Sequence, residues 1–301
     1  MTPPLRLIVG FSTGSMSAQV ARTIAPALSD VLRRDVTVEL VPGQNGALGA
    51  SLVAQSHADG DMLFVATLGT HALAPHVNRE LPYRPVLDFA PVSLISQSPL
   101  VLATHPALGV TSVSELVDFA QGHPGTLTYG TSALGGAPHL AAELFQDLAG
   151  ITMRHVRYDD TDRLYDDLEA GRIALSFNNV ASLLPRCTQG RLVALAITSA
   201  ERSTAAADLP AVAETLPGYQ VTNWVGLVAP ASTADEVTRS LSRAAGEALH
   251  VQSVAATFVA AGMLARGTTP EEFRGFIERE IGRWEIVVAR FRDRIQEQEQ
   301  A

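Results

Sequence analysis

The chain has 301 residues, of which 47% are hydrophobic and 18% are charged, so it is long enough for two domains with a large core. Its net charge of −9 and its scattered basic residues exclude a general attraction to nucleic acid or to an anionic membrane. The single cysteine, Cys187, excludes an intrachain disulfide and a cysteine-based metal cluster, and no stretch approaches the roughly 18 apolar residues of a transmembrane helix.

Short apolar runs alternate with helical patterns from the N-terminus onward, which predicts a parallel α/β protein. The expected strands are residues 5–9, 36–41, 62–67, two strands within 89–106, then 127–132, 153–158, 173–179, 192–198 and 224–230. The expected helices are residues 17–34, 47–56, 112–123, 137–150 with Gly150 as C-cap, 159–171, 180–190, 233–250, 251–262 and 269–296. The late strand at 224–230 predicts two domains, a discontinuous one of residues 1–103 and 226–301 and a second of residues 104–225.

The first predicted strand ends in Gly10-Phe11-Ser12-Thr13-Gly14, which matches the G-x-S-x-G nucleophile elbow of α/β-hydrolases. A hydrolase elbow needs an earlier strand to supply its oxyanion loop, and no strand precedes this one. A serine hydrolase using Ser12 therefore stays only a minor alternative. The same loop lacks the G-x-G-x-x-G of dinucleotide-binding proteins, and the chain has no P-loop motif, so we expect no cofactor.

A loop of small residues that opens a helix can bind a carboxylate or phosphate through the free backbone N–H groups of the helix. Ser15 and Ser17 can either cap the helix that follows or donate their hydroxyls to a ligand. Similar loops follow three further predicted strands, and in open α/β sheets ligands bind beyond the carboxyl ends of the strands. The sequence therefore predicts one neutral pocket lined by Phe11, Ser12, Thr13, Gly14, Ser15, Ser17, Thr67, Gly69, Thr70, His71, Thr131, Ser132, Ala133, His139, Tyr158, Asn178 and Asn179.

Some of these side chains have an equally ordinary structural interpretation. His71 and His139 can be hydrogen-bonded core residues instead of ligand contacts, and Tyr158 can pack against the protein instead of reaching the pocket. No group of His, Asp and Glu has the spacing of a metal site, so no metal is expected. The aspartates from Asp159 to Asp167 fit a solvated helix start better than a catalytic carboxylate pair.

Nearly the whole chain resembles the Bug-type (TctC-like) receptors of tripartite tricarboxylate transporters. The resemblance rests on "RLIVGFSTGSMSAQVAR", "VELVPGQNGALGASLVAQSHADGDMLF", "GTHALAP", "LPYRPVLDFAPVSLI", "LTYGTSALGGAPHLAAELF" and "HVRYDDTDRLYDDLEAGRIALSFNNVASLLP". It implies a two-domain periplasmic-binding-protein-like fold of type II, the Venus flytrap, which closes a cleft between its domains on a small carboxylate. It also implies membrane transporter subunits as partners of an exported receptor, with no enzyme activity and no insertion into the membrane.

Two departures from the family pattern bear on the ligand. Ala18 stands where the family's first loop carries an acidic residue, and Asn178 stands where the family has the aspartate of "FDN". Without these carboxylates an ammonium group has no counter-charge, so we expect a small organic acid that has no amine. The first residues lack the regions of a signal peptide. We therefore expect either a periplasmic protein whose leader was removed or a cytoplasmic ligand-sensing or accessory protein of the same fold.

Overall fold

The computed structural model describes residues 3–132, 136–158 and 160–300, and its elements alternate between strand and helix as predicted. The strands are β1 Leu5–Val9, β2 Val36–Leu40, β3 Met62–Thr67, β4 Phe89–Thr104, β5 Thr128–Thr131, β6 Arg154–Arg157, β7 Leu175–Asn179, β8 Val193–Ile197, β9 Thr222–Pro230 and β10 Leu264–Ala265. The helices are α1 Met16–Leu32, α2 Ala47–Ala54, α3 Ala74–Val77, α4 Val113–Gly122, α5 Ala137–Ala149, α6 Thr161–Glu169, α7 Val180–Thr188, α8 Asp235–Leu249, α9 Gln252–Ala260 and α10 Pro270–Gln300.

The chain divides into two compact units. Unit 1 contains residues 1–97, 224–259 and 264–290, and unit 2 contains residues 98–223, 260–263 and 291–301. The chain passes from unit 1 to unit 2 after Gln97, within β4, and returns at Trp224, within β9. The crossovers expected from the sequence, near residues 103–104 and 224–225, fall in the same two strands. The domain boundaries themselves stay a prediction.

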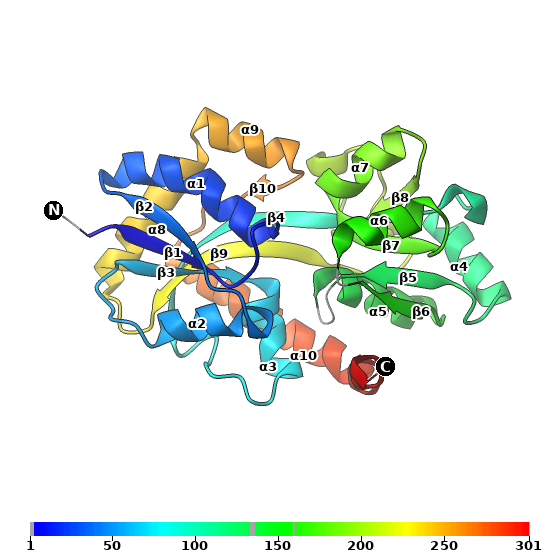
Figure 1. The fold of residues 1–301 in the computed structure, drawn as a ribbon, viewed down its shortest axis with the longest axis horizontal. Helices are drawn as coiled ribbons and strands as arrows, with labels where there is room; N and C mark the ends of the chain where they lie inside the picture. Colours follow the sequence, from blue (N-terminus) through cyan, green and yellow to red (C-terminus); the bar gives the residue numbers. More distant parts are fainter. Residues whose placement is uncertain (1–2, 133–135, 159, 301) are drawn as a thin grey trace. The chain divides into compact units, whose positions relative to one another are not determined.

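In unit 1 a sheet is covered by helices on both faces. Its order begins β2-β1-β3-β9-β4, and β1 pairs in parallel with both β2 and β3. Helix α1 packs against these strands and against α8, and Figure 1 shows α2 on the opposite side of the strands from α1. Because both faces are covered, β1 and β3 are almost entirely buried and read as continuous apolar runs.

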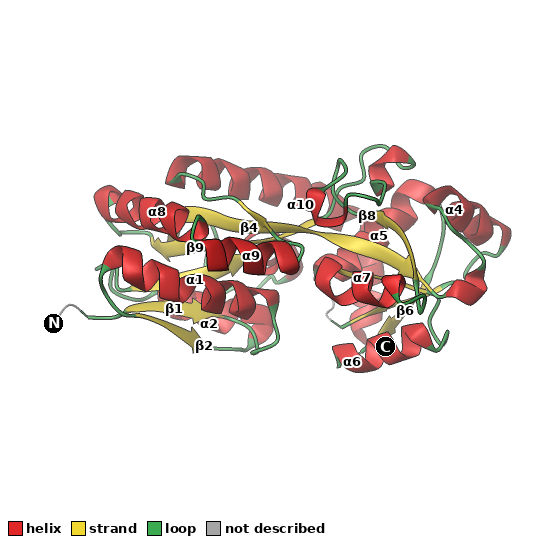
Figure 2. Cartoon of the chain, turned by 90° about the horizontal axis from the view of Figure 1, so that it is seen from above, coloured by secondary structure: helices red, strands yellow, loops and turns green. Residues whose placement is uncertain are grey.

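In unit 2 a second group of strands carries its own helices. The order continues β4-β7-β5-β6, in which β5 is parallel to β6 and β7, while β7 and β8 pair antiparallel with β4. Helix α5 packs on β5 and β7, and α7 packs on β7 and β8 (Figure 2). As predicted, α5 ends at Gly150, whose left-handed backbone (φ 63°) forms the C-cap.

One expectation about the strands is wrong. Residues 89–104 form the single strand β4 instead of two strands. In the structure β10 pairs with β4 at Ser96 and Gln97, and β7 pairs with it from Leu100 onward. Pro99, which has no N–H to donate to a ladder, falls between these two paired stretches.

Candidate functional site

In unit 1 the loop after β1 is closed by Ser15. The Ser15 hydroxyl donates to the carbonyl oxygen of Ser12 (2.7 Å) and accepts from the backbone N–H of Ala18 (3.2 Å), so Ser15 is the N-cap of α1. Ser17 is buried, with its hydroxyl 3.2 Å from that of Ser15. Of the two roles predicted for Ser15, the structure shows the cap, and contact with a ligand stays a prediction.

Ser12, Thr13 and Gly14 lie exposed at the tip of this loop, and Phe11 is half-buried. Within residues 3–132, 136–158 and 160–300 the Ser12 hydroxyl makes no hydrogen bond to a histidine or a carboxylate, so nothing there activates it as a nucleophile. The exposed hydroxyls of this loop can still bind a solute without reacting with it.

Arg22 also lies close to this loop, although it was not among the site residues predicted from the sequence. Arg22 extends from α1 back to the loop, with Nη1 3.5 Å from the carbonyl oxygen of Thr13. A shallow pocket of about 380 Å³ is lined by Thr13, Gly14, Gln19, Arg22 and Thr23. The signal was present in the sequence, since Arg22 follows the loop by two helical turns, but it stands outside the loop motif.

The loop after β3 in unit 1 is held by two threonines that cap each other. The backbone N–H of Thr67 donates to Thr70 Oγ1 (3.0 Å), and the N–H of Thr70 donates to Thr67 Oγ1 (3.3 Å). Residues Leu68–Leu73 then form a single π-helical turn, a form that occurs often at functional sites. Both threonines are buried, and their hydroxyls form hydrogen bonds within this turn. Gly69 is half-buried.

His71 is fully buried beneath the same turn. Its ring packs against Phe64, Tyr83 and Phe89, with ring centroids 4.8 to 6.1 Å away, and Nδ1 lies 3.1 Å from Thr70 Oγ1. Burial among these rings lowers the pKa of His71 to about 3, so the ring is neutral at physiological pH. The hydroxyl of Tyr83 donates to the carbonyl oxygen of Thr70 (2.7 Å) and fixes the turn from below.

The loops after β1, β2 and β3 meet at Gly46, which follows β2. A Cβ atom placed on Gly46 would lie 2.7 Å from Cγ2 of Thr70 and 3.0 Å from the ring of Phe11. Gly10 approaches equally closely, since its Cβ would lie 2.7 Å from Gly46 Cα. Because β1, β2 and β3 are parallel, their carboxyl ends share one edge of the sheet, where ligands of open α/β sheets bind.

In unit 2 the loop after β5 leads to a helix without a side-chain cap. Thr131 is buried, and its hydroxyl lies 2.7 Å from Nε2 of His155. Ser132 is half-buried, and Ala133 lies outside the described residues. Gly136 is the N-cap of α5 and, being glycine, has no side-chain oxygen with which to cap this helix. The N-terminus of α5 therefore places the positive end of its helix dipole at this strand end without a side-chain cap from its N-cap residue.

His139 lies one turn into α5, within a buried polar network. Glu143 is fully buried, and its Oε1 accepts from the hydroxyl of Tyr129 (2.6 Å) and from Nε2 of Gln146 (3.0 Å). Nε2 of His139 lies 3.9 Å from the same oxygen. His139 is itself fully buried, so the structure places it in this network beneath the loop.

The end of β7 repeats the arrangement seen at β5. Asn179 is the N-cap of α7 and provides no side-chain cap, and Oδ1 of Asn178 accepts from the backbone N–H of Asn179 (2.9 Å). Since β5 and β7 are parallel neighbours, α5 and α7 begin at the same edge of the unit 2 sheet. Two helix N-termini without side-chain caps therefore lie at neighbouring strand ends.

Tyr158 is buried, with its hydroxyl committed to a structural bond. The hydroxyl donates to Oδ2 of Asp167 (2.8 Å), and burial together with this bond raises the pKa of Tyr158 to about 12. Asp160 caps α6 by accepting from the N–H of Asp162 (3.0 Å), as expected for a solvated helix start. The structure thus gives Tyr158, Asp160 and Asp167 partners within unit 2, while Asp159 lies outside the described residues.

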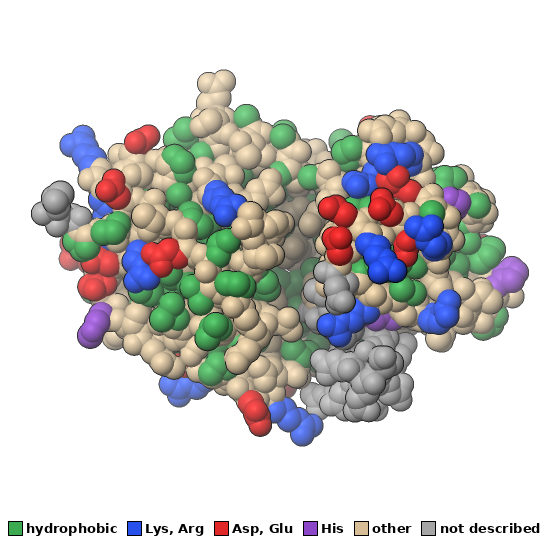
Figure 3. Space-filling view, in the orientation of Figure 1, with side chains coloured by type: hydrophobic (Ala, Val, Ile, Leu, Met, Phe, Trp, Pro, Cys, Tyr) green, Lys and Arg blue, Asp and Glu red, His purple; other side chains and the backbone are tan. Residues whose placement is uncertain are grey.

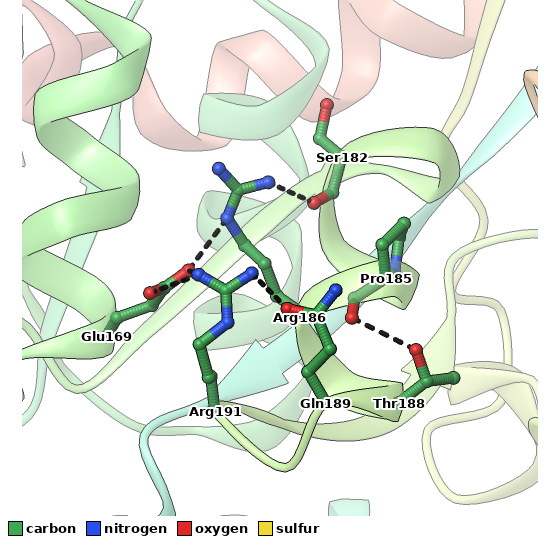
Figure 4. Close-up of polar contacts among 7 residues, drawn as sticks. All are labelled: Glu169, Ser182, Pro185, Arg186, Thr188, Gln189 and Arg191. Atoms are coloured by element: carbon green, nitrogen blue, oxygen red, sulfur yellow. Dashed lines mark hydrogen bonds and ion pairs between the residues drawn. The ribbon is translucent and has the colours of Figure 1, made fainter.

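Several arginines of unit 2 are paired with carboxylates on its surface. Charged side chains gather on the face over α6 and α7 in Figure 3. Figure 4 shows that Glu169 receives both Arg191 Nη1 (2.6 Å) and Arg186 Nε (2.9 Å), while Arg186 also donates to the carbonyl oxygen of Ser182. These arginines join α6, α7 and the start of β8, so their charges are balanced by ion pairs and are poorly placed to attract a solute.

The described residues show neither a metal-binding cluster nor a membrane-spanning helix. No group of three or more His, Cys, Asp or Glu side chains in this part of the chain is arranged to hold a metal ion. None of the described helices combines the length and the apolar content that crossing a membrane requires.

The family model of the tripartite tricarboxylate transporter family receptor matches residues 20–292. Protein BugT of Bordetella pertussis is 33% identical over 287 residues, which cover 95% of this chain and 88% of BugT. The R. palustris protein Rpa4515, solved with adipate, has a TM-score of 0.85 and 34% identity, and the match covers 96% of this chain and 97% of that one. MatC from Rhodopseudomonas palustris, solved with bound malate, has a TM-score of 0.82 and 28% identity over 95% and 99% of the two chains.

These similarities confirm the predicted two-domain periplasmic-binding-protein-like fold and the resemblance stated from the sequence motifs. The matched family consists of solute-binding receptors and not of enzymes, so the serine hydrolase alternative at Ser12 is excluded.

Proposed function

The chain belongs to the tripartite tricarboxylate transporter receptor family, and on that premise we propose that it captures a small carboxylate without an amine group. Its partners in this proposal are the membrane subunits of such a transporter. The observation that carries the ligand class is the pair of uncapped helix N-termini, α5 and α7, at the ends of β5 and β7. The adipate and malate in the two R. palustris proteins belong to the same chemical class.

Backbone N–H groups at a helix N-terminus favour an anion because they are unpaired and lie at the positive end of the helix dipole. In unit 2 a side-chain oxygen of the N-cap residue bonds to the first turn of α4 (Ser112) and of α6 (Asp160), whereas α5 and α7, like α2 and α8 in unit 1, begin without such a bond. The two starts without such an oxygen in unit 2 follow neighbouring strands, which supports a shared role in binding one anion. A carboxylate held this way needs no arginine.

The side chain of Asn178 is consistent with binding a solute that has no ammonium group. Its Oδ1 accepts from the N–H of Asn179, which leaves the side-chain NH₂ to donate to an anion. An aspartate at this position would repel a carboxylate and attract an ammonium group. In unit 1 the other position where the family has an acid is the buried Ala18, whose side chain has no oxygen to accept from an ammonium group.

The first test is a thermal-shift screen that sets adipate, malate, succinate and aromatic acids against glutamate, aspartate and sugars. A carboxylate present at 100 times its Kd should add about 2.7 kcal/mol to the free energy of unfolding, which is a clear rise in Tm. Stabilisation by amino acids without stabilisation by the plain acids would contradict the proposed ligand class. No stabilisation by any anion would contradict the receptor function proposed here.

The location of the protein in the cell and its membrane partners need a separate test. We propose that the mature protein works in the periplasm, as its family does. Fractionation of cells that express the full natural reading frame should recover it with periplasmic markers, and recovery with cytoplasmic markers would favour the ligand-sensing alternative. Deletion of genes for neighbouring transporter membrane subunits should abolish uptake of the acid that binds in vitro.

A further inference from the structure

The turn that follows β2 in unit 1 has an unusual backbone. Four consecutive residues have positive φ angles, namely Gly43 (146°), Gln44 (50°), Asn45 (53°) and Gly46 (90°). Glycine adopts such angles freely and asparagine adopts them more readily than most residues, but a glutamine there brings its Cβ close to the following carbonyl oxygen. Gln44 is therefore held in a strained conformation.

Nothing within the described residues explains why glutamine stands at this position. The turn is closed by backbone bonds, chiefly from the N–H of Gly46 to the carbonyl oxygen of Gly43 (2.9 Å), which a glycine at position 44 would also allow. The side chains of Gln44 and Asn45 are exposed, and neither forms a hydrogen bond to another described residue. Strained residues that serve no packing role tend to occur where a side chain is used by function.

The position of the turn suggests what that use is. Gly46, next to Asn45, touches Thr70 and the ring of Phe11, which belong to two of the loops predicted to bind the solute. Gln44 and Asn45 follow β2 at the edge of the sheet where β1 and β3 also end. Gln44 and Asn45 thus carry neutral hydrogen-bonding side chains on the turn that adjoins the loops after β1 and β3.

We infer that Gln44 and Asn45 are specificity-determining residues whose side-chain NH₂ groups donate hydrogen bonds to carboxylate oxygens of the solute. This inference rests on the proposed function, because it needs a solute that is an organic acid. It adds the loop after β2 to those after β1 and β3, although none of its residues was predicted from the sequence.

The first experiment replaces a donor with an anion of the same shape. Isothermal titration of adipate and malate is compared for the native protein, Gln44→Glu, Asn45→Asp and the matched control Gln55→Glu, an exposed residue at the end of α2. A carboxylate in contact with the solute should weaken binding of the better ligand at least tenfold. The control should stay within twofold, because exposed charges more than a Debye length apart are largely screened at about 0.15 M salt.

The second experiment separates strain from function with Gln44→Gly, which removes the strained Cβ and the carboxamide together. We expect Tm without ligand to stay the same or rise, while affinity falls at least fivefold. Arg33→Gly is the control, because Arg33 has a similar φ of 51° at the C-cap of α1. It should leave affinity unchanged.

The outcomes separate the two proposals. Native protein that binds an acid, with Gln44 and Asn45 variants within twofold of it, would overturn this inference and leave the proposed function standing. Native protein that binds none of the acids would overturn the proposed function, and this inference with it.

Discussion

After β1 and β3 in unit 1 the side-chain hydroxyls bond to the backbone of their own loops, whereas after β5 and β7 in unit 2 the helices begin without a side-chain cap. Ser15 caps α1, Thr67 and Thr70 cap each other, and α5 and α7 have no such partner. The hydroxyls after β1 and β3 hold their own loops in a fixed shape, whereas the N-cap residues of α5 and α7 leave the positive ends of these helices without a side-chain cap.

The support beneath the loops also differs. In unit 1 an aromatic cluster of Phe64, Tyr83 and Phe89 surrounds the neutral ring of His71. In unit 2 the support is polar, with the buried carboxylate of Glu143 held by Tyr129 and Gln146. Substitutions that act on only one kind of support can therefore test the comparison.

The largest effect is expected at Gly46, where the three loops of unit 1 meet. Gly46→Ala combines a left-handed backbone with a clash against Thr70 and Phe11, so we expect a loss of about 3 to 4 kcal/mol in unfolding free energy. Gly218→Ala is the matched control, because its φ of 87° is similar and nothing lies within 4 Å of its Cβ. It should lose only about 1 to 2 kcal/mol. Equal losses in urea unfolding would show that the loop contacts add nothing.

The second prediction concerns acid stability and His71. Its pKa of about 3 in the folded state lies below the ordinary 6.5, so the unfolded chain binds more protons between these values and stability falls as pH drops below 6.5. Two pH units at about 1.36 kcal/mol each give a loss of about 2.7 kcal/mol from pH 6.5 to 4.5.

His71→Phe keeps an aromatic ring in the cluster and cannot take up a proton, so it should remove that part of the pH dependence in unfolding measured at several pH values. A residual slope should remain from unit 2, where burial, His139 and Arg157 lower the pKa of His155 to about 4. An unchanged slope in His71→Phe would contradict the assignment.

The third prediction compares two tyrosine hydroxyls of unit 2. Tyr129→Phe removes a donor from the fully buried Glu143 and should cost about 2 kcal/mol of unfolding free energy. Tyr158→Phe removes a bond to Asp167, which water can replace, and should cost less than about 1 kcal/mol. Loss of solute affinity in Tyr158→Phe at unchanged stability would support the sequence-based prediction that Tyr158 contacts the solute.

The smallest effect is expected at the first loop. Ser15→Ala removes the N-cap of α1 and should cost about 1 kcal/mol, whereas Ser12→Ala should stay within about 0.5 kcal/mol because the Ser12 hydroxyl supports no other group in the described structure. Both proteins should fold, as judged by thermal unfolding. A larger loss in Ser12→Ala than in Ser15→Ala would reverse the roles assigned to the two hydroxyls.

Local patterns in the sequence predicted most of the fold. Alternating apolar runs located the strands, and Gly150 correctly marked the end of α5. The continuity of β4 through Pro99 could not be predicted, because it depends on where β10 and β7 pair with that strand. The pairing partners are far away in sequence, so local patterns cannot show that the strand is continuous.

For the candidate site the sequence identified strand-end loops but not how their atoms are used. Ser15 was rightly expected to be able to cap α1, since capping is a local property. The burial of His71 and His139, the position of Arg22 and the meeting of three loops at Gly46 are tertiary features. The positive φ angles of Gln44 and Asn45 could not be predicted from the sequence, because neither residue is glycine.

The most direct test is isothermal titration of the native protein and Asn178→Asp with the best acid from the screen and with its α-amino analogue, such as adipate against 2-aminoadipate. Asn78→Asp in unit 1 makes the same chemical change away from the predicted residues and serves as the control. We expect the native protein to prefer the plain acid at least tenfold, and Asn178→Asp to lower or reverse this preference while Asn78→Asp does not. A native preference for the amino acid, or a preference that Asn178→Asp leaves unchanged, would contradict this expectation.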